Sequence, residues 1–230
     1  ASSAASDVYK RQVLFNAMVK PWTAFPIKGV IWYQGEANVG RSEQYGDLFP
    51  ALITDWRRQW RSDFPFYFVQ LANFMESKKI QPDSEWAALR EAQTKALKLD
   101  QVGMAVTIDI GLADDIHPKN KQEVGRRLAL VALAGSYGKN VSSSAPVFQN
   151  YIIKGNKMEL DFGQKQDGFQ IKGTTLKGFT IAGPDRVFYP AEAMVHDGKI
   201  ILSSTEVPAP LAARYGWADN PDCNLYGENG

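Results

Sequence analysis

One short segment of the chain carries the residue types of a catalytic base and its carboxylate partner. His117 is one of two histidines among 230 residues, and it follows Asp114 and Asp115 in LADDIHPKNKQEVGRRLA at 112–129. A histidine base needs one tautomer, and a carboxylate bonded to Nδ1 selects that tautomer and stabilises the imidazolium. The same residues also suit a helix start, because carboxylates favour a helix N-terminus and Pro118 fits a first turn. By itself, the segment supports both interpretations equally.

A metal site is a weaker third interpretation of this segment. The possible ligands, Asp114, Asp115 and His117, lie together in one loop, and His196 is the only other histidine that could complete the set. His196 lies in VHDGKI, which is typical of an exposed hairpin turn, and we assign it no function. We therefore expect no metal.

A second candidate site lies in YQGEAN at 33–38, directly after an apolar run. Gly35 would let the backbone turn sharply, and backbone N–H groups with the Gln34 and Asn38 amides could line an oxyanion hole. Glu36 would bring a second carboxylate near the site. A plain turn between strand and helix is the simpler interpretation of this segment when it is taken in isolation.

Apolar runs alternate with amphipathic segments through the first part of the chain. Runs typical of buried strands cover 27–34, 64–72 and 103–110, and segments typical of helices cover 45–61, 84–99 and 121–138. Ser84 suits the N-cap of the second helix. This alternation predicts parallel βαβ units and a three-layer α/β domain. Ligands bind at the carboxyl ends of such strands, so we expect the loops with Gly35 and His117 to face one pocket.

The first predicted helix has an apolar row. Leu48, Leu52, Trp56 and Trp60 follow one another at intervals of four, which predicts that they line one buried face. We expect Pro50 to lie near the start of this helix, because proline disrupts a helix interior.

The pattern changes near residues 142–146. From 147 to about 205, short alternating segments such as NYIIKG, KMELDFG and GFTIAG predict antiparallel β-structure. ARYGWADNP at 213–221 is expected to return as a loop. We therefore expect the later part of an α/β domain at 13–144, and a β-rich subdomain with the returning C-terminal loop at 145–230.

Composition argues against several classes of protein. The net charge is +1 without a basic stripe, which argues against a nucleic-acid partner. No apolar run approaches the ~20 residues of a membrane-spanning helix. A single cysteine, Cys223, excludes an intrachain disulfide framework. The oligomeric state has no signal in the sequence.

The first twelve residues differ from the rest of the chain. SSAASDVYKRQ at 2–12 reads as the translation of a common transposase sequencing adapter, and the alternative is a natural flexible tail. We expect Val13 to be the first residue of the protein itself and any signal peptide to precede it. NLYGENG at 224–230 has no terminating feature. The chain is therefore expected to be a fragment.

Three segments, in order, carry a family resemblance: IKGVIWYQGEAN at 27–38, ALREAQ at 88–93 and DDIHPKNKQEVGRRLA at 114–129. Together they resemble the sialate O-acetylesterase family of bacterial carbohydrate esterases, which belongs to the SGNH-hydrolase superfamily. The stretch from GFTIAG to ARYGWADNPDCNLY is similar to the C-terminal part of the same family. The resemblance implies an SGNH-hydrolase-like three-layer fold, with an incomplete parallel sheet in this chain.

The resemblance also implies an activity. The family's enzymes are serine esterases that remove acetyl groups from sugars without a metal or an organic cofactor. O-acetylated sialic acid is the named substrate, and acetylated xylan or another polysaccharide is the nearest alternative. A non-catalytic carbohydrate-binding protein and a lipase-like esterase are further alternatives. The family usually acts outside the cytoplasm, so the resemblance implies a periplasmic or secreted parent protein.

The resemblance assigns the family histidine to His117. Its carboxylate partner stays open. The spacing in the superfamily points to Asp114, the DIHP form of the family points to Asp115, and Glu36 is a third candidate.

The other site residues implied by the resemblance surround the pocket. Gly35 with Gln34 takes the oxyanion-hole role, although the usual asparagine of that block is not cleanly matched. Arg90 and Gln93, in LREAQ, are expected to line the substrate pocket.

The chain departs from the family at the nucleophile. The family's serine lies in a GQSN-like block at an early strand-to-helix turn, and the chain has no such block. Ser136 alone follows a glycine directly, in AGSYG with no strand before it. We therefore expect the nucleophile upstream of this chain, and the chain alone to be nearly inactive, because only binding and oxyanion contributions would remain.

Overall fold

The computed structural model describes residues 12–80, 83–143, 145–163 and 168–227. The adapter-like interpretation concerns residues 2–12, and all of these except Gln12 lie outside the described part of the chain.

A parallel sheet forms the centre of the first part of the molecule. Its strands, in spatial order, are β1 (Val30–Trp32), β2 (Phe66–Val69) and β3 (Val102–Ala105). The register aligns Val30 with Phe66 and Phe66 with Val102. The central strand β2 is buried along its whole length, as expected of a strand that is covered on both faces.

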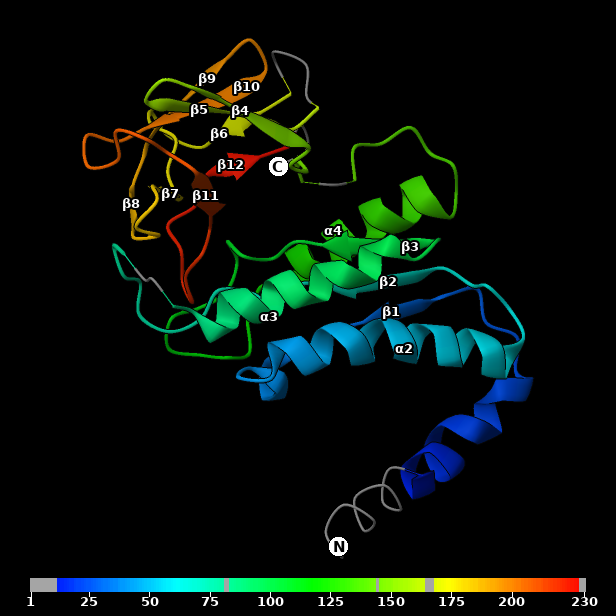
Figure 1. The fold of residues 1–230 in the computed structure, drawn as a ribbon. Coiled ribbons are helices and arrows are strands. Elements are labelled where there is room, and N and C mark those ends of the chain that lie inside the picture. Colours follow the sequence, from blue (N-terminus) through cyan, green and yellow to red (C-terminus); the bar gives the residue numbers. More distant parts are fainter. Residues whose placement is uncertain (1–11, 81–82, 144, 164–167, 228–230) are drawn as a thin grey trace, which may run out of the picture.

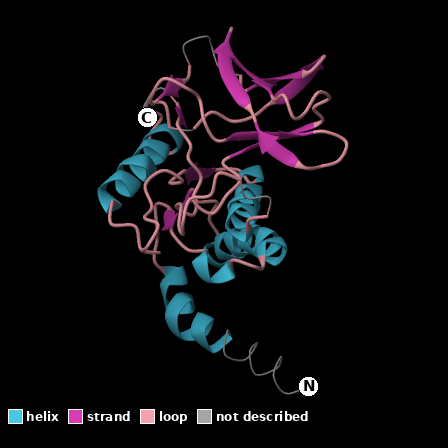
Figure 2. Ribbon diagram, turned by 90° about the vertical axis from the view of Figure 1, so that its left-hand side faces the viewer, coloured by secondary structure: helices cyan, strands magenta, loops and turns pink. Residues whose placement is uncertain are grey.

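Helices cover both faces of this sheet (Figures 1 and 2). The long helices are α2 (Ser42–Trp60), α3 (Glu85–Thr94) and α4 (Lys121–Gly135). Phe66 and Phe68 belong to an aromatic-rich core with residues of α2 and α3. Tyr67 points to the other face, where its hydroxyl bonds Ser136 at the end of α4 at 2.7 Å. The predicted three-layer α/β fold is confirmed.

The buried face of α2 differs from the predicted one. The residues buried along α2 include Tyr45, Phe49 and Ile53, whereas Leu48 is 51 % exposed. Four-residue steps advance roughly 40° beyond a full turn, so a row with this spacing drifts around the helix. The prediction that Leu48 lies on the buried face is therefore wrong. Pro50 lies inside the helix rather than near its start, because the helix begins at Ser42.

Short helical segments precede β1 or lie between the longer elements. They are η1 (Phe15–Val19), η2 (Lys20–Ala24), η3 (Glu36–Asn38) and η4 (Lys95–Lys98). η4 continues α3, so the two together match the helix predicted at 84–99. Ser84 is the N-cap of α3, as predicted, and its hydroxyl accepts the N–H of Ala87 at 2.9 Å. No helix in the described part of the chain has the length and apolar character needed to cross a membrane.

Antiparallel strands form the second part of the molecule (Figure 1). One sheet has the order β4-β5-β10-β9, from β4 (Asn150–Lys154), β5 (Lys157–Asp161), β10 (Lys199–Ser203) and β9 (Glu192–His196). Another has the order β11-β7-β8, from β11 (Ala212–Tyr215), β7 (Phe179–Ala182) and β8 (Phe188–Pro190). β12 (Leu225–Tyr226) pairs with β6 (Gln170–Ile171). The antiparallel prediction is confirmed.

Two details of this second part bear on the predictions. The segment 213–221 is not a loop throughout, because residues 213–215 belong to β11, which pairs with β7. His196 ends β9 beside the turn to β10 and is exposed, as predicted. The apolar clusters of the two parts share no residue. This separation supports the boundary at 144–145, which remains a proposal.

The exposed edge of the parallel sheet leads to a first prediction. β1 lies at one end of the strand order, and Ile31 is 72 % exposed on the face where α4 contacts β2 and β3. An edge strand with exposed apolar side chains favours association with other chains, because one of its sides has no partner strand. We expect the 13–230 polypeptide, expressed alone, to aggregate or fold poorly when followed by size-exclusion chromatography and thermal denaturation. A sharp two-state melt of a monodisperse sample would contradict this expectation.

Candidate active site

His117 lies in the loop that follows β3, and Asp115 lies beside it. Oδ1 of Asp115 accepts the backbone N–H of His117 at 2.9 Å and lies 3.7 Å from its Nδ1. The second distance is too long for a hydrogen bond, but catalytic hydrogen bonds often tighten only when substrate binds. The side chain of His117 is 88 % exposed and thus accessible to a reacting group. Asp114 is exposed, and Asp115 is the aspartate in contact with His117.

The helix-start interpretation does not account for the acidic pair. α4 begins at Lys121, and its N-cap is Asn120, whose side-chain oxygen accepts the N–H of Glu123 at 3.2 Å. Asp115 precedes this cap by more than a helical turn, beyond the range over which the helix dipole acts. Among the described residues, no three His, Cys, Asp or Glu side chains are placed to share a metal ion. Asp115 and His117 are therefore best described as a pair in a loop.

The loop after β3 is paired with the loop after β2. Gly111 donates its N–H to Oδ1 of Asn73 at 2.6 Å, and Met75 donates its N–H to the carbonyl of Ala113 at 3.1 Å. A parallel β-bridge lies between these two bonds. The backbone directly before the acidic pair is therefore held against a neighbouring segment.

The amides of the YQGEAN loop bond to other groups nearby. Nε2 of Gln34 donates to Oδ1 of Asn38 at 2.7 Å, and the hydroxyl of Tyr45 lies 3.2 Å from both oxygens of Gln34. Gly35 between them is buried. Because both side-chain amides have partners within the loop, backbone N–H groups are the better candidates for an oxyanion hole.

Gln93 ties this loop to the end of β2. It is fully buried. Its Oε1 accepts the N–H of Leu71 at 3.0 Å, and its Nε2 donates to the carbonyl of Gln34 at 3.3 Å. A Cβ atom on Gly35 would lie 3.1 Å from Nε2 of Gln93, so the close approach favours glycine there. The structure therefore places Gln93 behind the loop, and the expectation that it lines the substrate pocket stays a prediction.

Arg90 faces the C-terminal loop. It is 4 % exposed, and its guanidinium donates to the carbonyls of Gly216 at 3.0 Å, Ala218, and Asp219 at 3.5 Å. Burial lowers the pKa of Arg90 to about 10, against the opposing effects of Cys223 and Asp219. This buried guanidinium holds the C-terminal loop on α3, and the expectation that Arg90 lines the substrate pocket stays a prediction.

The two candidate loops follow parallel strands of one sheet and so lie at its carboxyl end. Nζ of Lys121, at the start of α4, lies 4.8 Å from the ring centroid of Tyr33 in the YQGEAN loop. Burial, and next the charge of Glu36, raise the pKa of Tyr33 to about 12. The two loops therefore lie at one edge, as predicted. Glu36 lies near Tyr33, whereas the carboxylate in contact with His117 is that of Asp115.

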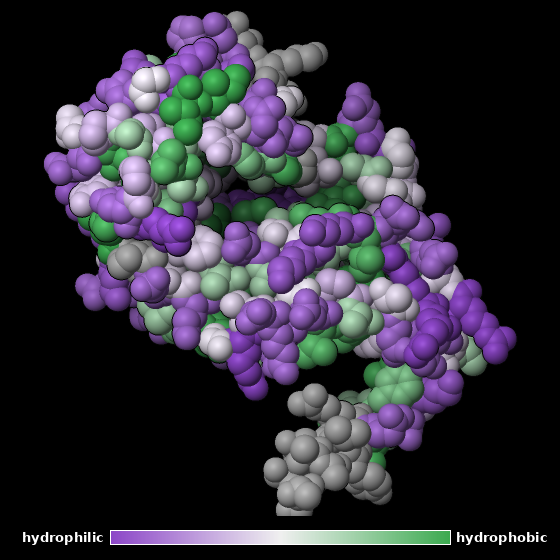
Figure 3. Space-filling view, in the orientation of Figure 1, coloured by the Kyte–Doolittle hydropathy of each residue, from purple (hydrophilic) through white to green (hydrophobic). Residues whose placement is uncertain are grey.

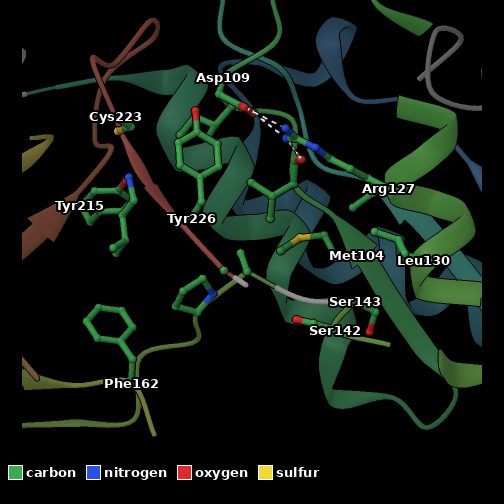
Figure 4. A pocket seen from close by; sticks show the side chains of 17 residues that line it. Met104, Asp109, Arg127, Leu130, Ser142, Ser143, Phe162, Tyr215, Cys223 and Tyr226 are labelled. Carbon is green, nitrogen blue, oxygen red and sulfur yellow. Dashed lines mark hydrogen bonds and ion pairs between the residues drawn. The ribbon is translucent and has the colours of Figure 1, made fainter. Parts of the chain in front are cut away.

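An ion-pair network that was not predicted joins α4 to the segment after β3. Arg127 donates to both carboxylate oxygens of Asp109, at 2.6 and 2.8 Å (Figure 4). It also donates to Glu123 at 2.8 Å. Burial alone would raise the pKa of Asp109, but the bonds and charge of Arg127 lower it below its ordinary value. Glu123 and Arg127 lie four residues apart on α4, a spacing at which the sequence alone indicates an ion pair. Their link to Asp109 depends on the fold.

Two cavities among the described residues are lined by side chains other than that of His117. One of about 130 Å³ lies between the two parts of the molecule, lined by Asp109, Cys223 and Tyr226 among others (Figure 4). Figure 3 shows the surface hollowed between these parts. A second, of about 400 Å³, is an apolar groove beside β4, β5 and β11. Burial raises the pKa of Cys223 to about 12, so its thiol is not an activated nucleophile.

Glu123 leads to a prediction about acid stability. Hydrogen bonding from Arg126 lowers the pKa of Glu123 from 4.5 to about 2. Burial opposes this shift, and the bond and charge of Arg127 add to it. A carboxyl group whose pKa is lowered by folding stabilises the fold above its unfolded pKa, and this contribution is lost as the pH falls through its folded pKa. The test uses the complete gene product, which is the protein as its gene encodes it. Its melting temperature should fall between pH 4.5 and about 2, and Glu123→Gln is expected to make this fall smaller.

The control for this prediction is Glu192→Gln, at an exposed position of β9. This variant should keep the wild-type dependence of melting temperature on pH. The same dependence in Glu123→Gln and in wild type would contradict the prediction.

A histidine–aspartate pair at the carboxyl end of a three-layer α/β sheet is an arrangement that hydrolases use where histidine acts as a general base. The chain belongs to the family of carbohydrate esterases described as sialic acid-specific acetylesterases, whose model matches residues 2–134. The resemblance noted in the sequence is confirmed. The match extends into residues 2–12, and the adapter interpretation of that segment remains a prediction.

The names of similar proteins are consistent with this family. The chain is 37 % identical to the sialate O-acetylesterase of Pongo abelii and 39 % identical to that of Mus musculus, over 94 % of this chain in each case. A crystal structure of a carbohydrate acetylesterase from Xanthomonas citri matches 94 % of the chain, with a TM-score of 0.87 and 44 % identity. The chain spans 46 % and 45 % of the two mammalian proteins and 51 % of the bacterial one.

Proposed function

We propose that the protein that contains this chain hydrolyses O-acetyl esters on sugars, with His117 as general base and Asp115 as the carboxylate that orients it. The observation that carries this proposal is the pairing of an accessible His117 with Asp115 in the loop after β3. The family of the chain supports the same chemistry.

The proposed reaction has two steps. A serine hydroxyl attacks the acetyl carbonyl while His117 takes its proton, and the tetrahedral intermediate then expels the sugar hydroxyl, which receives that proton. Water, activated by His117, then attacks the acetyl-serine and releases acetate. The negative charge on the carbonyl oxygen is stabilised in each step by backbone N–H groups at or near Gly35.

We propose that the serine lies outside this chain. Two serines in the described part of the chain bond to groups other than His117. Ser84 caps α3 and donates to Asp219, and Ser136 bonds Tyr67. In the described part of the chain, the polar contact of the His117 side chain is with Asp115. We propose likewise that the chain is an inactive fragment of a longer bacterial enzyme.

O-acetylated sialic acid is the substrate that we propose. The support is the name of the mammalian relatives, sialate O-acetylesterase. The relative from Xanthomonas citri is described only as a carbohydrate acetylesterase. Acetylated xylan, the nearest alternative implied by the family resemblance, is the comparison substrate.

The test is release of acetate by the complete gene product, the protein as its gene encodes it. It should be measured with O-acetylated sialic acid, acetylated xylo-oligosaccharide and a long-chain acyl ester, beside the 230-residue chain alone. The proposal expects acetate from the sialic acid ester by the complete product only. Preference for xylan would correct the substrate, and preference for the long acyl chain would favour a lipase-like esterase. Binding of acetylated sugar without turnover would favour a carbohydrate-binding protein.

A further inference from the structure

We infer that Asn73 and Asn220 are positioning residues for His117. Their side-chain amides come from loops 147 residues apart in the sequence and bond to each other beside the loop that carries His117. This inference rests on the proposed function, which supplies the role of His117 as a base.

The two amides form a continuous set of hydrogen bonds. Nδ2 of Asn73 donates to Oδ1 of Asn220 at 2.7 Å, and Oδ1 of Asn73 accepts the N–H of Gly111 at 2.6 Å. Nδ2 of Asn220 donates to the carbonyl of Met75 at 2.7 Å. Each asparagine thus uses one donor and one acceptor, which a residue without a side-chain amide cannot reproduce.

The bonds continue to the backbone beside the catalytic pair. The N–H of Met75 donates to the carbonyl of Ala113 at 3.1 Å, and Ala113 directly precedes Asp114 in the sequence. Asn220 therefore acts on the His117 loop through Met75, and Asn73 acts on it through Gly111. A displacement of either loop would move His117 relative to its reacting partner.

The packing of these loops leaves little freedom. A Cβ atom on Gly111 would lie 1.9 Å from the carbonyl oxygen of Asn73, a distance that no side chain can accept. Met75 has a φ angle of 70°, in the left-handed region that non-glycine residues seldom adopt. Such a conformation persists only where surrounding contacts hold it, and it often accompanies functional sites.

The C-terminal loop that carries Asn220 is held by further bonds that do not involve the amide of Asn220. Arg90 bonds the carbonyls of residues 216, 218 and 219, and the hydroxyl of Ser84 donates to Oδ1 of Asp219 at 2.6 Å. The carbonyl of Asp219 accepts the N–H of Phe74 at 3.2 Å. Figure 1 shows the segment after β11 reaching the N-terminal end of α3. Asn220 therefore acts from a fixed position.

The test compares substitutions that remove different bonds, all in the complete gene product. Asn220→Ala removes both bonds of its amide, and Asn73→Leu removes both bonds of the other. Asn73→Asp is the conservative variant, because it keeps an acceptor for Gly111 and replaces the donor to Asn220 with an acceptor oxygen. Asn156→Ala, in the exposed turn between β4 and β5, is the matched control. Melting temperatures identify any variant that fails to fold.

The first measurement does not depend on esterase activity. In NMR spectra, Asn73→Leu is expected to speed amide hydrogen exchange of Gly111 by about tenfold and to shift the ring signals of His117. The ring signals of His196, at the end of β9, are an internal reference and should not change. Asn73→Asp should retain the protection of Gly111. Unchanged His117 signals in folded Asn73→Leu and Asn220→Ala would overturn the inference.

The second measurement is turnover of the acetyl ester. Displacement of a base slows the chemical step but changes substrate affinity little. Asn220→Ala and Asn73→Leu are therefore expected to lower kcat by about 10–100-fold with KM nearly unchanged. Asn73→Asp should recover part of this loss, and Asn156→Ala should equal wild type. Wild-type kcat in variants whose His117 signals shift would mean a structural role alone and would overturn the inference. An inactive wild type would overturn the proposed function, and the NMR signals would still decide whether the two amides hold His117.

Discussion

Replacing His117 with alanine is expected to lower kcat/KM for an acetyl ester by about 10³-fold or more in the complete gene product. The imidazole takes the proton of the attacking serine and returns it to the leaving sugar hydroxyl, so both steps of the proposed reaction lose their base. KM should change little, because an exposed imidazole contributes mainly to the transition state. The measurement is initial-rate release of acetate over a range of substrate concentrations.

Further variants make this first prediction specific. His196→Ala, at the exposed end of β9, should leave the rate unchanged. Asp115→Asn should lower kcat by about 10²–10⁴-fold, because the carboxylate that selects the tautomer of His117 is lost. Asp114→Asn should cost less than about tenfold, because Asp115 is the aspartate in contact with His117. The reverse order would assign the orienting role to Asp114, and a fully active His117→Ala variant would exclude the mechanism.

Replacing Arg90 with methionine is expected to lower the free energy of unfolding of the complete gene product by about 3 kcal/mol. Methionine preserves most of the buried aliphatic packing but removes the guanidinium bonds to the carbonyls of Gly216, Ala218 and Asp219. The carbonyl of Ala218 then loses its bond from Arg90, whereas those of Gly216 and Asp219 keep a backbone N–H. Buried acceptors without donors cost free energy that a surface substitution does not. The measurement is chemical denaturation at neutral pH.

The matched control for Arg90 is Arg58→Met on α2. The side chain of Arg58 is 77 % exposed, and it bonds Asp55 at 2.6 Å on the helix surface. An exposed pair of this kind contributes less than about 0.5 kcal/mol. Equal effects of the two substitutions would show that the C-terminal loop does not depend on Arg90.

Local patterns were sufficient to predict the layers of the fold. Apolar runs between helical segments indicated parallel strands covered on both sides, and the strands β1, β2 and β3 lie inside the predicted runs except for Val102. Ser84 was recognisable as an N-cap because a cap depends on residues three positions apart. The family resemblance around His117 was readable for a similar reason, since its motifs are continuous in the chain.

Contacts between distant segments could not be read in this way. The side chains of Asn73 and Asn220 look like ordinary loop residues in the sequence, and only the fold brings them together. Arg90 lies in a motif that suggested a substrate contact, yet the C-terminal loop covers it. Hydrophobic periodicity reports which face of an element is buried, but it carries no information about which distant polar group will be its partner. Those pairings depend on how the loops return across the sheet.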